Sequence, residues 1–333
     1  MVGKLPPKLL ARLLAEIHIQ DERVLVGPGS GLDCAVIEMG DRLLVMKTDP
    51  VTFASDAIGW YAVQVNANDI ATSGAEPRWF LATCLMPPGT CESDIEDIAR
   101  QLSDACAALG ISLVGGHTEI THGIDRPILC GTMIGEIAPR DLITPRGAQT
   151  GDSILLTKGI PIEAVTLLAR EFPDQVSEAL GNKKLKQAVN YLSDPGISVV
   201  RDARIAIQAG KVNAMHDPTE GGLAGALWEL AEACGQRLVF DPRKVHIPKL
   251  AAEVCAVFQL DPFASLASGA LLLTSPPSDA RDIIQKMTSS GIRCDSIGKV
   301  EGGLPEVYQI THTQQRLLPR PERDEIGKVF ELR

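Results

Sequence analysis

The chain has 333 residues, of which 45% are hydrophobic and 22% are charged, and its formal net charge is −10. This composition excludes a disordered polymer and gives room for two globular domains of ordinary size. The acidic balance argues against a partner with a phosphate backbone, so we expect no nucleic acid to bind. A nucleotide triphosphate remains compatible with it, because divalent cations can bridge carboxylates to phosphates.

The eight cysteines have no C-x-x-C spacing, which excludes a zinc ribbon and a thioredoxin-like motif. Most of them lie in apolar runs, so we expect buried, reduced thiols and a cytoplasmic protein. The N-terminus has no apolar run of signal-peptide length, and no stretch approaches about 18 consecutive apolar residues. We therefore expect neither export nor a membrane partner.

In the first half of the chain, helical and strand periodicities alternate. Apolar residues at helical spacing predict a short amphipathic helix over 8–19, and a glycine-rich turn, Gly27-Pro-Gly-Ser-Gly31, follows. We expect buried strands over 43–48, 79–86, 111–115 and 128–137, and helices over 56–73 and 93–109. Ser55 or Asp56 is expected to cap the first of these helices, and the capping box Ser93-x-x-Glu96 the second. Gly74 and Gly110 are expected to end them.

The run from Pro139 to Gly147 breaks the periodicity and is the predicted domain boundary, with one domain over 1–146 and the other over 147–333. Beyond it we expect strands over 153–157, 212–215, 237–240, 268–274 and 294–300. The helices expected between them cover 161–171, 183–193, 197–209, 222–234 and 278–290. Strands interleaved with helices predict an α/β (α+β) fold in both halves.

Four segments place acidic residues where a folded core would not leave them unpaired. They are Gly29-Ser-Gly-Leu-Asp33, Thr48-Asp49-Pro50, Asn66-Ala-Asn-Asp69 and His216-Asp-Pro-Thr-Glu-Gly-Gly222. Carboxylates and phosphate oxygens together hold magnesium, and glycines let backbone N–H groups approach phosphates. The alternatives are an ordinary Asp-Pro turn at Asp49, a buried structural acceptor at Asp69 and a helix cap at Asp217.

The segment Gly115-Gly-His-Thr-Glu119 ends a predicted strand with two glycines and then presents three polar side chains. A tight turn with surface polar residues is the alternative to a binding site. An imidazolium at His117 can contact phosphate, and a neutral imidazole can act as a base. The sequence does not choose between these two roles.

Taken in order, six segments from about Gly27 to Val300 resemble the superfamily of aminoimidazole ribonucleotide (AIR) synthetase. Its members include selenophosphate synthetase, thiamine-monophosphate kinase and the carbamoyl dehydratase of hydrogenase maturation, and this last family with its AIR-synthase-related relatives is the most similar. The segments are Gly31-Leu-Asp-Cys-Ala-Val36, Lys47-Thr-Asp49, Val65-Asn-Ala-Asn-Asp-Ile-Ala71 with Gly74-Ala-x-Pro77, Val114-Gly-Gly-His-Thr-Glu119, Thr144-Pro-Arg-Gly-Ala-x-x-Gly-Asp152 and His216-Asp-Pro-Thr-Glu-Gly-Gly-Leu223.

The resemblance implies a homodimer in which strands of the N-terminal α/β domain join those of a second subunit in a barrel. It also implies ATP and Mg²⁺ as cofactors, and a small-molecule substrate whose carbonyl or amide-type oxygen is activated by phosphoryl transfer. The implied metal-binding residues are Asp33, Thr48, Asp49, Asp69 and Asp217. The implied nucleotide-binding residues are Gly29, Gly31, Gly116, Thr118, Arg146 and Thr219. The implied catalytic residues are His117, Asp217 and Glu220.

Three departures separate this sequence from the family patterns. Leu32 stands where the family has a second acid, which would reduce the number of bound metals. The chain ends Glu331-Leu-Arg333 without the cysteine that carries the thiocarbamate, so we do not expect cyanide-ligand synthesis on its own C-terminus. His117 stands where thiamine-monophosphate kinase has an acid. A small-molecule kinase of that type and a non-catalytic ATP-binding maturation partner remain the alternatives to an activating enzyme.

Overall fold

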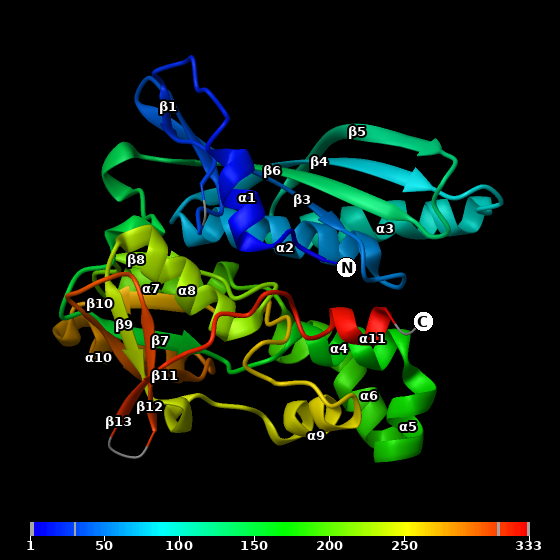
Figure 1. Ribbon diagram of the computed structural model, residues 1–333. Helices are drawn as coiled ribbons and strands as arrows, with labels where there is room; N and C mark the ends of the chain where they lie inside the picture. The colour runs from blue at the N-terminus through cyan, green and yellow to red at the C-terminus, as the bar shows by residue number, and fades with distance from the viewer. Residues whose placement is uncertain (1–2, 30, 312–313, 332–333) are drawn as a thin grey trace. The chain divides into compact units, whose positions relative to one another are not determined.

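The computed structural model describes residues 3–29, 31–311 and 314–331, which form two compact units (Figure 1). The first, here called the N-terminal unit, comprises Ile19–Gly27 and Asp33–Leu142. The second, here called the C-terminal unit, comprises Met1–His18, Pro28–Leu32 and Ile143–Arg333. Each is a mixed α/β structure with its own sheet, in agreement with the fold class expected from the sequence.

The N-terminal unit is built on a six-stranded sheet in the order β1-β2-β3-β6-β4-β5. All neighbouring strands are antiparallel except β4 and β5, which are parallel. Its elements are β1 (Val24–Val26), β2 (Ala35–Met39), β3 (Arg42–Val51), α2 (Ile58–Thr72), β4 (Glu76–Met86), α3 (Glu92–Leu109), β5 (Ser112–Ile120) and β6 (Ile128–Ile137). The strand predicted over 128–137 is confirmed at both ends.

The central strand β6 shows how this sheet is covered. Its odd-numbered residues are buried against α2, and its even-numbered residues are only partly buried on the opposite face. Glycine is required at two odd positions, because a Cβ at Gly131 would lie 2.5 Å from the Asn66 amide nitrogen and one at Gly135 would lie 2.4 Å from Ile70. Within this unit, α2 and α3 lie on one face of the sheet (Figure 1).

Both predicted helix caps in this unit are wrong. The residue before α2 is Ala57 at φ 55°, which offers no side-chain cap, and Gln101 of α3 instead accepts a hydrogen bond from the Gly59 amide in the first turn. Helix α3 begins at Glu92, so Ser93 lies inside the first turn instead of at the cap. Glu92 and Asp94 place negative charge in that turn, where the helix dipole favours it. The predicted ends are confirmed, since Gly74 and Gly110 both have positive φ.

Strand β5 is longer than predicted and lies at the edge of the sheet. The prediction ended the strand at residue 115, but pairing with β4 continues to Ile120, so His117 belongs to a strand and not to a following turn. Every residue of β5 is exposed. Gly116 is required by the pairing itself, because a Cβ there would lie 2.0 Å from the carbonyl oxygen of Ala82.

The C-terminal unit has a seven-stranded mixed sheet in the order β13-β12-β9-β11-β7-β10-β8. Its strands are β7 (Ser153–Thr157), β8 (Ala214–His216), β9 (Arg237–Phe240), β10 (Leu272–Ser275), β11 (Cys294–Glu301), β12 (Val307–Thr311) and β13 (Gln314–Leu317). Its helices are α1 (Pro7–Leu14), α4 (Glu163–Glu171), α5 (Pro173–Leu180), α6 (Asn182–Asn190), α7 (Val200–Ala209), α8 (Gly222–Cys234), α9 (Lys249–Val257), α10 (Pro277–Ser289) and α11 (Gly327–Phe330).

Strand β7 is buried on both faces, as its continuous apolar run requires. Ile154 and Leu156 join the core on the face that α8 covers. Leu155, also fully buried, points to the opposite face, where α10 lies against β7 (Figure 1). Helices α4, α5, α6 and α9 pack on one another in a separate group.

The sequence patterns located most of these elements but missed several. Strands 153–157 and 237–240 and helix 222–234 are confirmed at both ends. The first helix ends at Leu14, short of the predicted residue 19, and α5, α9, β12 and β13 were not predicted. No disulfide links any of the eight cysteines, all of which the structure describes. Among the described helices, none is long and apolar enough to cross a membrane.

Candidate functional site

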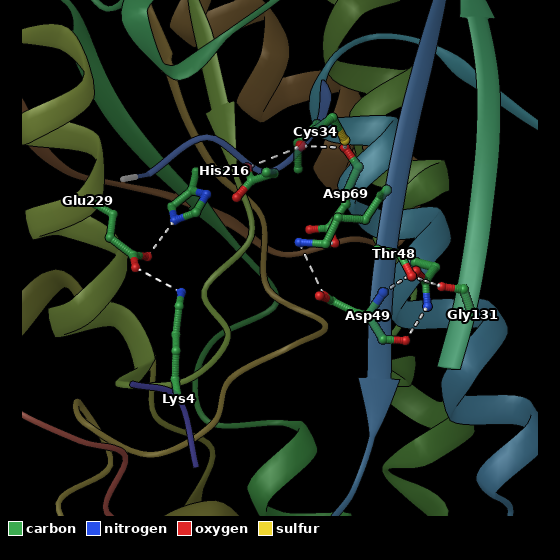
Figure 2. A network of polar contacts seen from close by, with 12 residues as sticks. Lys4, Cys34, Thr48, Asp49, Asp69, Gly131, His216 and Glu229 are labelled. Atoms are coloured by element: carbon green, nitrogen blue, oxygen red, sulfur yellow. Dashed lines mark hydrogen bonds and ion pairs between the residues drawn. The ribbon is translucent and has the colours of Figure 1, made fainter. Parts of the chain in front are cut away.

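In the N-terminal unit, two of the predicted aspartates, Asp49 and Asp69, lie close together (Figure 2) and share one lysine as a partner. Lys47 and Asp49 are two residues apart on β3, so both side chains point to the face that α2 covers. The Lys47 Nζ lies 3.2 Å from Oδ2 of Asp49 and 3.0 Å from Oδ2 of Asp69, which α2 supplies. The predicted aspartates 49 and 69 therefore lie together, with an ammonium group between them.

The charge on Lys47 is maintained by its neighbours. Burial by itself lowers the pKa of this lysine, but the nearby carboxylates of Asp69, Asp49 and Asp33 raise the pKa well above its ordinary value. Asp69 is the more deeply enclosed partner, with 4% of its side chain exposed against 39% for Asp49. A buried ion pair of this kind persists because each charge compensates for the other's lost hydration.

Polar contacts with α2 fix the backbone around this ion group. The Asn66 side chain accepts a hydrogen bond from the Asp49 amide at 2.9 Å and donates one to the Asp49 carbonyl. The Cys34 thiol donates to the carbonyl oxygen of Asp69 at 3.1 Å, and the Thr72 hydroxyl donates to Asp33 at 3.5 Å. Asp33, predicted from a segment far from α2 in the sequence, is thereby held beside that helix.

Thr48 lies on the opposite face of β3 from its two neighbours in the sequence. Its hydroxyl donates a hydrogen bond to the carbonyl oxygen of Gly131 at 2.8 Å and accepts one from Thr132 at 3.3 Å. Among the contacts of the described residues, none joins its side chain to the ion group of Lys47, Asp49 and Asp69. The alternation of the strand separates it from the other predicted metal ligands of this unit.

Gly116, His117 and Thr118 lie three strands away from Asp49 in the same sheet. The register aligns Asp49 with Gly131, Gly131 with Ala82 and Ala82 with Gly116. Three strand spacings correspond to about 14 Å. The His117 side chain is 66% exposed, and its Nε2 lies 3.1 Å from Glu119 on the same strand. Within one N-terminal unit, these residues do not join the aspartates.

In the C-terminal unit, the segment after β8 leads into α8. His216, which is buried, places its Nε2 3.0 Å from Oε2 of Glu229, and Lys4 approaches the other carboxylate oxygen of Glu229 at 3.0 Å (Figure 2). Burial alone would raise the pKa of Glu229, but the hydrogen bond with His216 and the charge of Lys4 lower the pKa to about 2. Glu229 is therefore a carboxylate that fixes both the His216 ring and the N-terminal segment.

Glycines allow two chain segments to reach α8. Gly31 has φ 69°, and a Cβ there would lie 2.5 Å from the carbonyl oxygen of Glu229. Gly222 has φ 59°, and a Cβ there would lie 2.6 Å from the carbonyl oxygen of Phe263. The first turn of α8 is capped from the end of the chain, since Asp324 accepts a hydrogen bond from the Gly221 amide at 2.7 Å. A close backbone approach, more than phosphate binding, explains these glycines in the structure.

Three of the remaining predicted residues of the C-terminal unit lie along the same segment. Asp217 is buried at the end of β8, and Thr219 and Glu220 are partly buried in the turn before α8. Arg146 is exposed on the short 3₁₀ helix Pro145–Gly147, which contacts both β8 and α8. Gly29 belongs to the turn whose Gly31 meets α8 at Glu229. Thr219 thus lies at the start of α8, whereas Gly31 reaches the second half of that helix.

Comparison with known proteins identifies the family of this chain. The description "AIR synthase related protein, N-terminal domain" matches residues 31–137, and "AIR synthase related protein, C-terminal domain" matches residues 149–309. The chain belongs to the AIR synthase related family. The resemblance predicted from the six sequence segments is confirmed.

Relatives within and near this family have named activities. MJ0676 of Methanocaldococcus jannaschii, provisionally named a hydrogenase expression/formation protein, is 25% identical over 97% of this chain and 96% of its own. Carbamoyl dehydratase HypE of Azotobacter vinelandii is 26% identical over 86% of this chain and 80% of its own.

Two crystal structures with the same fold contain nucleotides. The hydrogenase maturation protein HypE in complex with ATP matches with a TM-score of 0.72 at 22% identity, covering 94% of this chain and 90% of that one. AaThiL complexed with AMPPCP and TMP matches with a TM-score of 0.70 at 19% identity, covering 93% and 94%. At these identities the structures establish the fold of this family member.

Two charged side chains that contact the predicted segments, Lys47 and Glu229, were not predicted as site residues from the sequence. Lys47 was part of a family segment, and its spacing of two from Asp49 on a strand was a signal that both share a face. Glu229 lies seven residues, or two helical turns, after Gly222, so it shares the face on which α8 begins. In neither case does the sequence identify the partner across the fold.

Proposed function

We propose that the protein is an ATP- and magnesium-dependent enzyme that activates a carbonyl or amide-type oxygen of a small substrate by phosphoryl transfer. The observation that carries the proposal is the grouping of Asp33, Asp49 and Asp69 beside α2 in a member of the AIR synthase related family. Carbamoyl dehydratase relatives suggest the substrate class, and the ATP complex of HypE suggests the cofactor.

The donor set of the N-terminal unit suits magnesium. Mg²⁺ prefers hard oxygen ligands and usually binds through one or two protein carboxylates together with substrate phosphates. Asp49, with 39% of its side chain exposed, is accessible to a hydrated ion, and Asp33 supplies a second carboxylate near the same helix. When bound, the ion would offset the negative charge on the phosphates. Asp217 and Thr48 remain proposed ligands from the family resemblance, whereas the role of Asp69, which the resemblance also implies as a ligand, depends on its ion pair with Lys47.

The chain's own residues would do the positioning. Asn66 holds the Asp49 backbone, so the carboxylate is presented from a fixed strand. Arg146 and backbone amides of the glycine segments around Gly29, Gly31 and Thr219 would orient the triphosphate, as charged and backbone donors do in phosphoryl transfer. Glu229 would keep the His216 ring in one orientation beside Asp217. His117, Asp217 and Glu220 are the proposed groups for proton transfer.

A second copy of the chain is the proposed partner of the N-terminal sheet. Strand β5 presents exposed Leu113, Val114 and Ile120 along an unpaired edge, an arrangement that monomers usually avoid. A homodimer with a barrel made from two such sheets would cover this edge and bring Gly116, His117 and Thr118 to an interface. Sedimentation at micromolar concentration should give twice the chain mass, and a monomer there would contradict this part of the proposal.

Asp49→Asn is the most direct test of the enzymatic role. We expect magnesium-dependent ATP turnover, screened against a panel of small carbonyl and amide metabolites, to fall by about 100-fold or more, the usual effect of removing one preorganised electrostatic contact. Asp41→Asn is the matched control, because Asp41 is exposed in the turn before β3. Unchanged turnover in Asp49→Asn would contradict the role of this aspartate.

The fate of the γ-phosphate separates the alternatives. Phosphate that stays on the substrate would favour a kinase of the thiamine-monophosphate type, a possibility supported by the fold match with AaThiL. Phosphate that is released with the substrate altered favours the activating enzyme. ATP binding by calorimetry with no turnover, alone or with candidate partners, would favour a non-catalytic maturation partner and overturn the enzymatic proposal.

A further inference from the structure

The ammonium group of Lys47 occupies the space between two carboxylates that the family resemblance assigns to metal binding. It lies 3.0 Å from Asp69 and 3.2 Å from Asp49. A magnesium ion bound between the same two carboxylate oxygens would need ligand distances near 2 Å, and would then lie against the ammonium. The two cations exclude each other from this place by size and by charge repulsion.

Exposure divides the two aspartates into different roles. Only 4% of the Asp69 side chain is exposed, and 20% of the Lys47 side chain, so their contact faces the protein interior. Asp49 is 39% exposed, and a hydrated ion with its phosphate ligands can reach it from solvent. The neighbouring segment contributes Asp33 but has the apolar Leu32 before it, so it adds a single carboxylate.

We propose that Lys47 is a built-in cation that takes the place of one divalent ion in the nucleotide site. In this arrangement Asp69 is a positioning residue that holds the ammonium, while Asp49 and Asp33 serve the divalent ion that arrives with the nucleotide. The site consequently takes one divalent ion fewer than its aspartates alone would hold. This inference rests on the proposed function for the nucleotide, but its test with a free metal ion does not.

The decisive measurement is Mn²⁺ binding without nucleotide, by electron paramagnetic resonance or calorimetry, to the wild type and to Lys47→Met. Methionine keeps a similar length and removes the charge. We expect Lys47→Met to gain one Mn²⁺ site per chain, with affinity raised by about tenfold or more, because the buried Asp69 and the half-exposed Asp49 then lose the ammonium between them. Equal stoichiometry and affinity in both proteins would overturn the proposal.

Lys299→Met is the matched control, since Lys299 forms an exposed ion pair with Glu301 and its loss changes the net charge equally. It should bind Mn²⁺ like the wild type, and a gain there would show a general charge effect and overturn the proposal. Lys47→Arg keeps the cation and should also bind like the wild type.

Asp69→Asn keeps the proposal testable where Lys47→Met fails to fold. If Lys47 is the partner of Asp69, this variant should bind Mn²⁺·ATP within about threefold of the wild type, whereas loss of a carboxylate that contacts the ion directly costs about tenfold or more, as loss of an interaction with a charged group does. A loss of that size would overturn the proposal. A wild type that binds no ATP at all would instead contradict the proposed function, and the Mn²⁺ comparison would still decide the role of Lys47.

Discussion

In the N-terminal unit, the buried carboxylate of Asp69 lies 3.0 Å from the ammonium of Lys47. In the C-terminal unit, the buried carboxyl groups of Glu163 and Asp324 are influenced by another acid, Glu220. Burial, with a contribution from neighbouring carboxylates, raises the pKa of Glu163 to about 8 and that of Asp324 to about 7. The N-terminal unit buries the charged Asp69 together with a cation. The C-terminal unit holds Glu163 largely protonated and Asp324 about half protonated at neutral pH, whereas its Glu229, beside Lys4, stays ionised.

The difference identifies the acids that are suited to cation chemistry. A carboxylate remains ionised inside a protein where a positive charge or hydrogen-bond donors compensate for its desolvation. Asp49 and Asp69 meet that condition, so their surroundings favour cations. Asp324 instead accepts hydrogen bonds from the amides of Gly221 and Ile326, which joins the end of the chain to the start of α8. Its role in the structure is to hold these segments together.

The largest expected change in stability comes from a variant in which the side chain at position 163 is always neutral. Because its folded pKa lies above the ordinary value of 4.5, the protonated group stabilises the fold below about pH 4.5, and that stability is lost as the pH rises through about 8. Glu163→Gln removes this dependence. The free energy of unfolding of the variant, relative to wild type, should increase by about 4 kcal/mol between pH 4.5 and 8, at about 1.4 kcal/mol per pKa unit.

Urea unfolding across this pH range, followed by Trp228 on α8, would measure the effect. Glu178→Gln on α5 is the control, because Glu178 is exposed in the same unit. A pH dependence that is the same in Glu163→Gln and wild type would show that Glu163 is already ionised when folded, and the contrast between the two units would disappear.

A smaller effect is expected from Asp69→Asn, which removes the charge that compensates Lys47. The buried ammonium keeps Asp49 as a partner. We therefore expect the free energy of unfolding to fall by about 3 kcal/mol, which is at the lower end for a broken buried ion pair. In a Trp228→Phe background, Trp60 and Trp79 report the N-terminal unit alone. Asp104→Asn, exposed on α3, should change the unfolding midpoint little. A similarly small change in Asp69→Asn would show that Lys47 does not depend on this carboxylate.

Local sequence patterns determined much of the fold and the identity of the acidic segments. The apolar run that predicts β6 and the apolar spacing that predicts α3 are patterns of neighbouring residues, so they can be recognised without knowledge of the whole molecule. Helix starts were less predictable. Residues such as Ser93 have the right chemistry for a cap, but α3 already begins at Glu92, with Cys91 in the cap position. The family resemblance also followed from short segments, and the comparisons confirm it.

Only the tertiary structure decided which ionisable groups face one another. Lys47 meets Asp69 from a different element, Lys4 meets Glu229 across 225 positions, and Asp324 reaches Gly221 across 103. The order of the strands also places His117 at an exposed edge of the sheet, whereas alternation within β3 by itself puts Thr48 on the opposite face from Asp49. Periodicity reports which face of an element a side chain occupies, whereas its partner depends on how distant elements pack, and that information is not local.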